Sequence, residues 1–237
     1  PGTEEYSESK AKGISLNGNI SDAVVSGNTV ENIGDEDTVK TRGLSIVEGE
    51  VGPTNFTVTG NTFETIESGM TEGTTVEGAV ALFVGGYSDL GSEHVVTGNK
   101  FFDGIVRNCC EEQPTLNAQK NYWGAADGPS NEGDGSGVPV GQDINYTPWY
   151  ATQETNSETE NVEVSGSPVF ALSDTIQGGI NAASSGDTVT VYEGTYEENV
   201  DINVQNLTVK AAKEADAVIE TVEGLHPTVE ITQPEVT

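Results

Sequence analysis

The acidic and basic side chains are the residues of this sequence best suited to catalysis, but their spacing matches no catalytic set. Glycosidases need two carboxylates that flank the bond they cut, yet the sequence has neither an Asp-Asp pair nor an Asn-Thr-Asp segment. A polysaccharide lyase needs an Arg or Lys base beside carboxylates that hold Ca²⁺. The basic residues available for this role do not fall together with acids on one strand: Lys12, Lys40, Arg42, Lys100, Arg107 and Lys120. We therefore predict no catalytic residue, and we interpret Glu111-Glu112 as a solvated edge.

One glycine-rich segment carries oxygen ligands of the kind that calcium prefers. Asp127, Asn131 and Asp134 lie close together in the chain, next to the glycines of Gly133–Gly137. Their spacing matches neither the EF-hand loop nor the Gly-Gly-x-Gly-x-Asp repeat. A calcium site and a plain loop therefore remain alternative interpretations, and calcium is the one cofactor that the sequence leaves open.

The cysteines and histidines give no metal set. Cys109 and Cys110 are the only cysteines and are adjacent, so they cannot build a disulfide framework. They are either two small, partly buried residues or a vicinal disulfide that stiffens the loop after Arg107. His94 and His226 are isolated in the sequence.

Asn-x-Ser/Thr sequences mark candidate glycosylation sites, as expected for a secreted protein. They begin at Asn19, Asn55, Asn145 and Asn206. Pro148 directly follows the Asn145 site and makes it the poorest acceptor, whereas Asn55 in its loop is the favoured one. Chance occurrence is the alternative in a chain rich in Asn and Thr.

The charge of the chain excludes whole classes of partner. Among 237 residues there are 39 acidic and 9 basic ones, which gives a net charge of −30. Such a chain repels nucleic acid and anionic membranes, and no apolar run approaches the roughly 20 residues of a membrane span. No signal peptide is recognised, so we expect a mature form or an excised segment. We predict an extracellular location, without nucleic-acid binding or membrane insertion by this segment.

The acidity has two competing explanations, a disordered acidic chain and adaptation to high salt. The acids alternate with regularly spaced apolar residues instead of forming blocks, which argues against disorder. In about 1 M salt the Debye length is roughly 3 Å, so the repulsion between carboxylates costs little. The composition therefore favours a halophilic source.

Two short motifs repeat along the first half of the chain. The first contains Gly-Asn and is found at Val25–Ile33, Val58–Ile66, Val96–Ile105 and, in degenerate form, Ala118–Trp123. The second begins with glycine and is found at Gly13–Leu16, Gly43–Ile46 and Gly78–Leu82. Alternate residues in both are apolar, which is the period of a strand with one buried face.

The repeats predict an all-β solenoid of stacked coils. A single coil of short strands cannot bury its apolar face, whereas stacked coils share a core and pair edge to edge. Gly-Asn suits the bend between strands, and its asparagines are predicted to stack as a hydrogen-bonded ladder. Unequal repeat lengths predict projecting loops at Gly34–Lys40, Glu48–Asn55, Glu67–Thr74 and Gly85–Glu93. A propeller or an antiparallel sandwich fits the repeats less well.

The end of the repeat region resembles a known family. Asn121-Tyr122-Trp123-Gly124, Asp127-Gly128-Pro129 and Ile144–Tyr150 are similar to the closing segment of right-handed parallel β-helix surface proteins, the NosD-like and pectate-lyase-like group, here of haloarchaeal type. The resemblance implies that aromatic residues cover the last coil: Tyr122, Trp123, Tyr146 and Trp149. A sugar-stacking aromatic platform is the alternative.

A later segment resembles the opening of the same family. Asp174–Ala183 and Gly186–Val200 are similar to its short amphipathic helix and its Gly-Asp-Thr-Val strand. The helix is predicted to be capped by Ser173 or Asp174 and to bury Ile176, Ile180 and Ala183. The pair Gly178-Gly179 weakens it.

These patterns predict three regions. Residues 1–150 are the C-terminal part of a right-handed parallel β-helix, residues 151–163 an acidic linker, and residues 164–237 the helix-capped start of a second β-helix. The function predicted is that of a structural or adhesive surface protein, which stacks head to tail on itself or on flanking modules and contacts surface glycans. A carbohydrate-active enzyme, a polysaccharide lyase or hydrolase, or a carbohydrate-binding tailspike module is the alternative.

Overall fold

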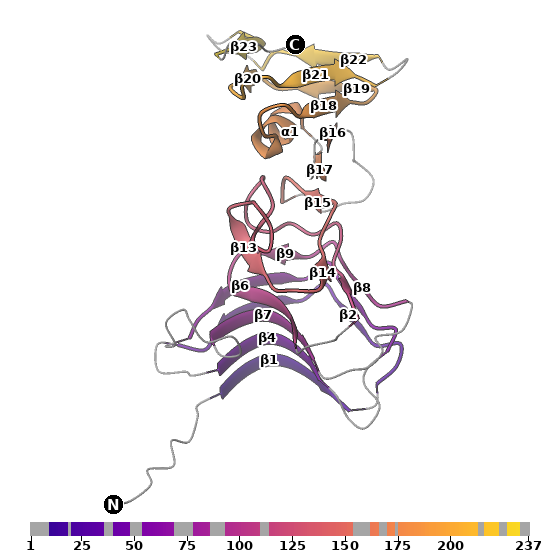
Figure 1. Ribbon diagram of the computed structural model, residues 1–237, viewed down its shortest axis with the longest axis vertical. Helices are drawn as coiled ribbons and strands as arrows, with labels where there is room; N and C mark the ends of the chain where they lie inside the picture. The colour runs from indigo at the N-terminus through magenta and orange to yellow at the C-terminus, as the bar shows by residue number, and fades with distance from the viewer. Residues whose placement is uncertain are drawn as a thin grey trace, which may run out of the picture. The chain divides into compact units, whose positions relative to one another are not determined.

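The computed structural model describes most of the chain and shows an all-β protein whose sheets are mainly parallel (Figure 1). The described residues are 10–18, 20–35, 40–47, 54–68, 78–85, 93–109, 114–153, 162–165, 170–173, 175–212, 216–222 and 227–232. The chain divides into two compact units. Unit 1 is Pro1–Ala118 with Val138–Asn145, and unit 2 is Gln119–Gly137 with Tyr146–Thr237. The three-region organisation predicted from the sequence stays a prediction.

Unit 1 consists of short strands that pair in parallel with the corresponding strands of neighbouring repeats. One sheet contains β1 (Lys10–Asn17), β4 (Lys40–Val47), β7 (Gly78–Gly85), β10 (Ile105–Cys109) and β13 (Gly137–Val140). A second contains β2 (Val24–Ser26), β5 (Thr57–Thr59) and β8 (Val95–Thr97). A third contains β3 (Thr29–Ile33), β6 (Thr62–Ile66) and β9 (Lys100–Phe101), and β11 (Leu116–Asn117) pairs with β14 (Ile144–Asn145). The predicted alternation of two stacked strand motifs is confirmed.

The register places like residues above one another in a continuous core. Val30 pairs with Phe63, and Phe63 pairs with Phe101, with their rings stacked at 5.0 Å. Each of these side chains is buried. The register corrects one alignment from the sequence: Leu44 pairs with Leu82, so Gly43 lies opposite Ala81 and not Gly78. Gly43 is required there, because a Cβ would approach the Ala81 carbonyl oxygen to 2.7 Å.

The Gly-Asn turn builds the asparagine ladder that the repeats predicted. The Asn28 amide donates to Asn61 Oδ1 at 2.9 Å, and the Asn61 amide donates to Asn99 Oδ1 at 2.9 Å. The backbone N–H groups of Asn28 and Asn61 donate to the same two oxygens. Gly27, Gly60 and Gly98 precede them at φ of 65 to 66°. In the degenerate fourth copy Lys120 takes the same conformation before Asn121, so the local turn is kept without glycine.

Unit 2 contains a five-stranded sheet and two strand pairs. The sheet is ordered β15 (Trp149–Tyr150), β17 (Phe170–Ser173), β16 (Val162–Ser165), β18 (Thr188–Val191) and β21 (Thr208–Ala211). The pairs are β19 (Gly194–Glu197) with β22 (Ala217–Glu220), and β20 (Val200–Ile202) with β23 (Val229–Ile231). β12 (Pro129–Asn131) also lies in this unit.

The end of the predicted linker lies in the sheet of unit 2. Val162 and Glu163, assigned to its end, lie in β16, which pairs antiparallel with β17 and β18. Val162 is fully buried, so hydrophobic burial draws this part of the acidic segment into the sheet. β15 pairs in parallel with β17, and Trp149-Tyr150 is therefore an edge strand of this sheet. Residues 154–161 of the linker lie outside the described residues.

The helix α1 (Ile176–Ala182) forms where the sequence predicted it, but with different caps. Thr175 is the N-cap, and its hydroxyl accepts from the Gly178 N–H. The Glu198 carboxylate also accepts from the Ile176 and Gln177 N–H groups at 2.8 and 2.9 Å. Ser173 instead accepts from the Thr175 N–H, and Asp174 lies outside the described residues. Thr175 is better placed than Ser173 because it directly precedes the first helical residue.

The buried face of α1 explains its two glycines. Ile176 and Ile180 are buried as predicted, but Ala182 takes the buried place expected for Ala183. A Cβ on Gly179 would approach Val162 Cγ1 to 2.6 Å, and one on Gly178 would approach Ser173 Oγ to 2.3 Å. The glycines therefore permit close packing on the sheet, which offsets their poor helix propensity. In the part of the chain that the structure describes, no helix is long and apolar enough to cross a membrane.

Candidate functional site

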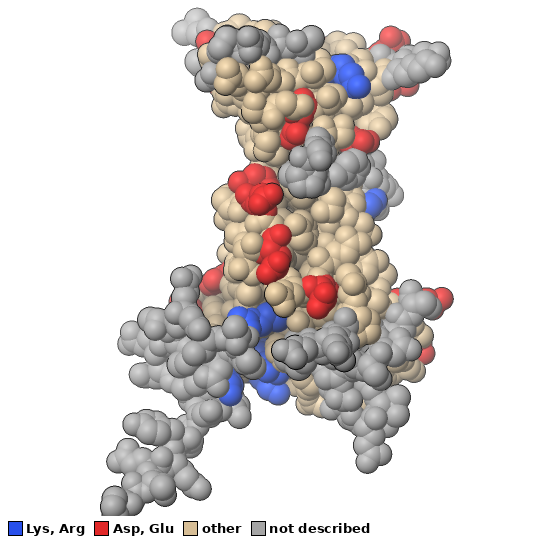
Figure 2. All heavy atoms as spheres, in the orientation of Figure 1, with Lys and Arg blue, Asp and Glu red and all other residues tan. Residues whose placement is uncertain are grey.

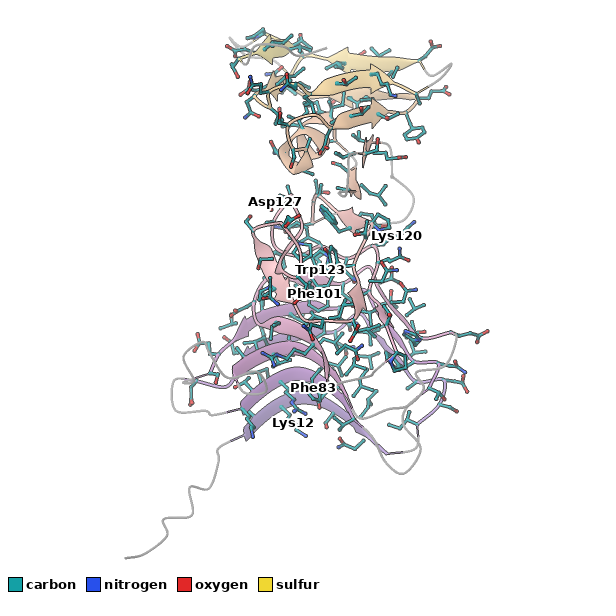
Figure 3. All side chains as sticks on the ribbon, in the orientation of Figure 1. Lys12, Phe83, Phe101, Lys120, Trp123 and Asp127 are labelled. Atoms are coloured by element: carbon teal, nitrogen blue, oxygen red, sulfur yellow. The ribbon has the colours of Figure 1, made fainter. Side chains whose placement is uncertain are left out.

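A strip of basic side chains lies on the outer face of the first sheet of unit 1. We define this basic strip as Lys12 of β1, Lys40 and Arg42 of β4, and Arg107 of β10. Lys12 pairs with Arg42, and Lys10 pairs with Lys40. Figure 2 shows Lys and Arg atoms gathered on this face, and Figure 3 labels Lys12 and Phe83 on the same sheet.

Arg42 and Phe83 fix the position of the strip. The Arg42 guanidinium carbon lies 3.4 Å from the centre of the Phe83 ring, and its Nη1 donates to Ser45 Oγ at 3.2 Å. Ser45 pairs with Phe83, and Phe83 pairs with Arg107. The intervening Leu44 is fully buried in the core, so Ser45, Phe83 and Arg107 lie on the outer face. A guanidinium stacked on an aromatic ring keeps its charge and loses mobility.

The clustering of these cations is electrostatically unfavourable without an anionic counterpart. Neighbouring parallel strands are about 4.8 Å apart, and like charges at directly paired positions destabilise a sheet. Anionic groups at the strip, from acidic segments of the chain or from a ligand, would remove this cost.

The sequence does not reveal the basic strip directly, because its cations lie on different strands and not beside acids on one strand. The register of the paired strands brings these cations together on one face of the sheet. A signal was nevertheless present: a basic residue directly precedes the motif glycine in Lys12-Gly13 and in Arg42-Gly43.

The residues proposed as calcium ligands lie in a loop that is fixed by its own hydrogen bonds. Asp127 Oδ1 accepts from Ser136 Oγ at 2.9 Å. Asn131 and Asp134 are exposed. A Cβ on Gly135 would approach the Gly128 carbonyl oxygen to 2.3 Å, so this segment is closely folded. The structure thus gives Asp127 a protein partner, and calcium binding stays a prediction.

The predicted cap aromatics are mostly buried. Trp123, Trp149 and Tyr122 are 0, 2 and 8 % exposed, and Trp149 Nε1 donates to the Ala126 carbonyl at 3.0 Å. Tyr146 is partly exposed and donates to the Glu132 carbonyl. Buried rings cannot stack on a sugar, so burial argues against a sugar-binding platform formed by Tyr122, Trp123 and Trp149. For Tyr146 this alternative stays open.

Burial also shifts the acidity of the two tyrosines. Burial raises the pKa of Tyr122, and a hydrogen bond with Gln153 lowers it by a smaller amount. The pKa of Tyr146 is raised by burial and further by the negative charges of Asp134 and Glu132. Both phenols are therefore protonated at neutral pH and act as donors and packing groups.

The candidate glycosylation sites differ in accessibility. Asn145 and Asn206 are exposed, whereas Asn55 is partly buried and its Oδ1 accepts from the Glu93 N–H. Asn206 is therefore better exposed than the Asn55 favoured by the sequence. Asn19 lies outside the described residues, as do Cys110 and the side chain of Cys109, so the vicinal disulfide stays a prediction.

No other cluster in the described residues points to chemistry. In the parts that the structure describes, no three His, Cys, Asp or Glu side chains come together to hold a metal ion. His94 instead accepts from the Asn117 N–H at 3.2 Å and packs near Phe56. Comparisons of the chain with protein-family models, with curated proteins and with solved structures find no match.

Proposed function

We propose that this chain is a non-catalytic adhesive module of an extracellular surface protein, and that its basic strip binds an acidic polysaccharide. The proposed fold is a right-handed parallel β-helix of the NosD-like and pectate-lyase-like type, from a halophilic archaeon. The observation that carries the proposal is the stacking of Lys12 on Arg42 beside Phe83. A polymer with regularly spaced carboxylates or sulfates would neutralise several strands at once.

High salt is compatible with this binding. At low salt the net charge of −30 repels an anionic polymer. At about 1 M salt the Debye length is roughly 3 Å, which removes that repulsion but leaves contacts at hydrogen-bond distance largely intact. Arg supplies such contacts because its guanidinium binds carboxylate and sulfate oxygens through paired donors.

Binding to polygalacturonate tests the proposal. The double variant Lys12→Gln/Lys40→Gln is expected to bind about 5- to 30-fold more weakly than the wild type, since each lost charged contact costs about 0.5–1 kcal/mol. The control is Lys100→Gln/Lys210→Gln, which removes the same charge from β9 and β21. Calorimetry in about 1 M NaCl, with neutral dextran as a second ligand, measures the difference.

Two results would count against adhesion at the strip. Equal affinity of both double variants would show that the strip is not the site. Release of reducing ends or of unsaturated products from polygalacturonate would favour the alternative, a polysaccharide lyase or hydrolase, for which Arg107 or Lys40 would be the candidate base.

The proposed halophilic source predicts that stability rises with salt. Acids stack in register at Glu31–Glu64, Glu197–Glu220 and Asp201–Glu230. Repulsion between paired carboxylates is screened by salt. Glu64→Gln is expected to stabilise unit 1 by about 0.5 kcal/mol at low salt and by nearly nothing at about 1 M NaCl. Urea unfolding across a salt series measures this, with the exposed Glu193→Gln as control. Full wild-type stability in low salt would contradict the halophilic proposal.

A further inference from the structure

The outer face of the five-stranded sheet in unit 2 is polar. On the inner face Val162 and Val189 are fully buried, and a Cβ on Gly179 would contact both of them, so α1 covers that face. The side chains that alternate with these valines point to the other side: Glu163 and Ser165 of β16, Thr188 and Thr190 of β18, and the β21 partners Thr208 and Lys210. Since β16, β18 and β21 lie side by side (Figure 1), these residues form one surface of hydroxyl groups with one carboxylate and one ammonium group.

Tyr192 directly follows β18 and places an aromatic ring at one end of this surface. The residue is 40 % exposed. Its hydroxyl donates to Glu163 Oε2 at 2.9 Å, so the ring reaches from the end of β18 toward β16. The Tyr196 hydroxyl donates to the Tyr192 carbonyl at 2.9 Å and holds the backbone. The hydrogen bond to Glu163 and the negative charge of that carboxylate raise the pKa of Tyr192, so the phenol is protonated at neutral pH and keeps this bond.

A tyrosine held in this way is suited to stacking on a sugar. Because its hydroxyl and backbone are already fixed, ligand binding costs little further side-chain entropy. A neutral sugar has an apolar C–H face that can pack on the aromatic ring, and hydroxyl groups around its rim. Tyrosine combines an apolar ring with a polar end, and the neighbouring Glu163 and Thr190 can accept hydrogen bonds from such hydroxyls or donate to them.

We propose that this surface binds a neutral β-linked glycan, with one sugar ring stacked on Tyr192 and its hydroxyls bonded to Glu163 and Thr190. In the described part of the chain Glu163 uses only Oε2, in its bond with Tyr192, so Oε1 accepts from the sugar. Thr190 lies beside Glu163 because the two residues pair across β18 and β16. An extended glycan continues over the hydroxyl groups of Thr188 and Thr208. The site belongs to unit 2 and does not depend on polysaccharide binding by the basic strip of unit 1.

The charges of the surface favour a neutral glycan over an acidic one. The Glu163 carboxylate lies at the Tyr192 ring, where it would repel the carboxylate of a stacked uronate. Lys210 lies on the far side of Thr190 in the same row, so the row carries one charge of each sign and attracts neither polyanions nor polycations. A protein partner would need a larger apolar patch than the ring of one tyrosine. The selectivity is therefore opposite to that of the basic strip.

Binding of cellohexaose, a neutral β-linked glycan, tests the inference. In NMR titrations of the full chain in about 1 M NaCl, Tyr192→Ala is expected to bind at least about tenfold more weakly than the wild type, because the stacking ring is lost. Tyr192→Phe keeps the ring and loses only the bond to Glu163, so its affinity is expected to stay within about threefold of the wild type. The matched control is Phe102→Ala, which removes an aromatic residue of unit 1 that is 36 % exposed and is expected to change nothing.

Competition with polygalacturonate separates this site from the basic strip. An excess of polygalacturonate is expected to leave cellohexaose bound to the wild type, whereas displacement would mean one shared site and would contradict the inference. An unchanged circular dichroism spectrum shows that each variant is folded. Absence of saturable cellohexaose binding by the wild type, or a loss of affinity in Tyr192→Phe or Phe102→Ala equal to that in Tyr192→Ala, would overturn the inference and leave the polysaccharide proposal untouched.

Discussion

Asn61→Ala is expected to destabilise unit 1 by about 3–5 kcal/mol, because it leaves several buried polar groups without partners. The Asn61 side chain is fully buried. Its amide donates to the Val25, Thr59 and Asn99 side-chain or backbone oxygens at 2.9 to 3.1 Å. Its oxygen accepts from both nitrogens of Asn28. Alanine would remove all of these hydrogen bonds. Water could satisfy the polar groups left behind only if the turn opened.

Asn28→Ala is the matched control for this prediction. Asn28 occupies the same place in the same motif, but it is partly exposed and is the first ladder member described. Its loss is expected to cost about 1 kcal/mol, since water reaches the groups that it leaves behind.

Urea unfolding in high salt, followed by circular dichroism, measures both changes. Tryptophan fluorescence reports on unit 2, where Trp123 and Trp149 lie. The urea midpoint followed by tryptophan fluorescence should shift little in either variant. Equal destabilisation by the two substitutions would show that the ladder contributes nothing beyond the local turn.

The repeated parts of the fold could be predicted because their residues carry local signals. Gly-Asn and alternating apolar residues recur in each repeat from Val25 to Phe101. They predict the turns and the stacking of equivalent strands. The helix with Ile176 and Ile180 follows from its amphipathic spacing. Within the repeats, the partner of a residue is the equivalent residue of the next repeat, so the sequence itself contains both sides of the contact.

The remaining features depend on contacts between unlike segments. Val162 joins the sheet through pairing with β17 and β18, which the polar sequence around it does not indicate. Glu198 caps α1 from the bend after β19, 22 residues along the chain from Ile176. The basic strip depends on the register between β1 and β4, because Lys12 and Arg42 lie on different strands and are brought together only by pairing. The four projecting loops predicted from the repeat lengths lie largely outside the described residues.

Gly128→Ala is expected to destabilise unit 2 by about 3–4 kcal/mol through two separate effects. Gly128 has a φ of 88°, which favours glycine over residues with a Cβ. A Cβ there would also approach the Trp149 ring to 2.6 Å at Cε2. Trp149 is 2 % exposed and donates to the Ala126 carbonyl, so it cannot move aside without breaking this partly buried hydrogen bond.

Gly186→Ala separates the two effects. Gly186 belongs to the same unit and has a φ of 93°, but nothing lies within 4 Å of the Cβ that alanine would add. Its substitution is expected to destabilise the unit by only about 1 kcal/mol, which is the cost of placing alanine at a positive φ without any clash. Tryptophan fluorescence and near-ultraviolet circular dichroism during urea unfolding would report both variants, since the indole of Trp149 senses the change directly.

A second substitution at Trp149 shows whether the contact itself is responsible. Phenylalanine is smaller, so in the double variant Gly128→Ala/Trp149→Phe the new methyl group has room, although the bond to Ala126 is lost. The cost of Gly128→Ala should therefore be smaller by about 1–2 kcal/mol in the Trp149→Phe background than in the wild type. Equal costs in the two backgrounds would mean that the positive φ of Gly128 alone accounts for the loss of stability. The closely folded segment from Asp127 to Gly137 would then not depend on the contact between Gly128 and Trp149.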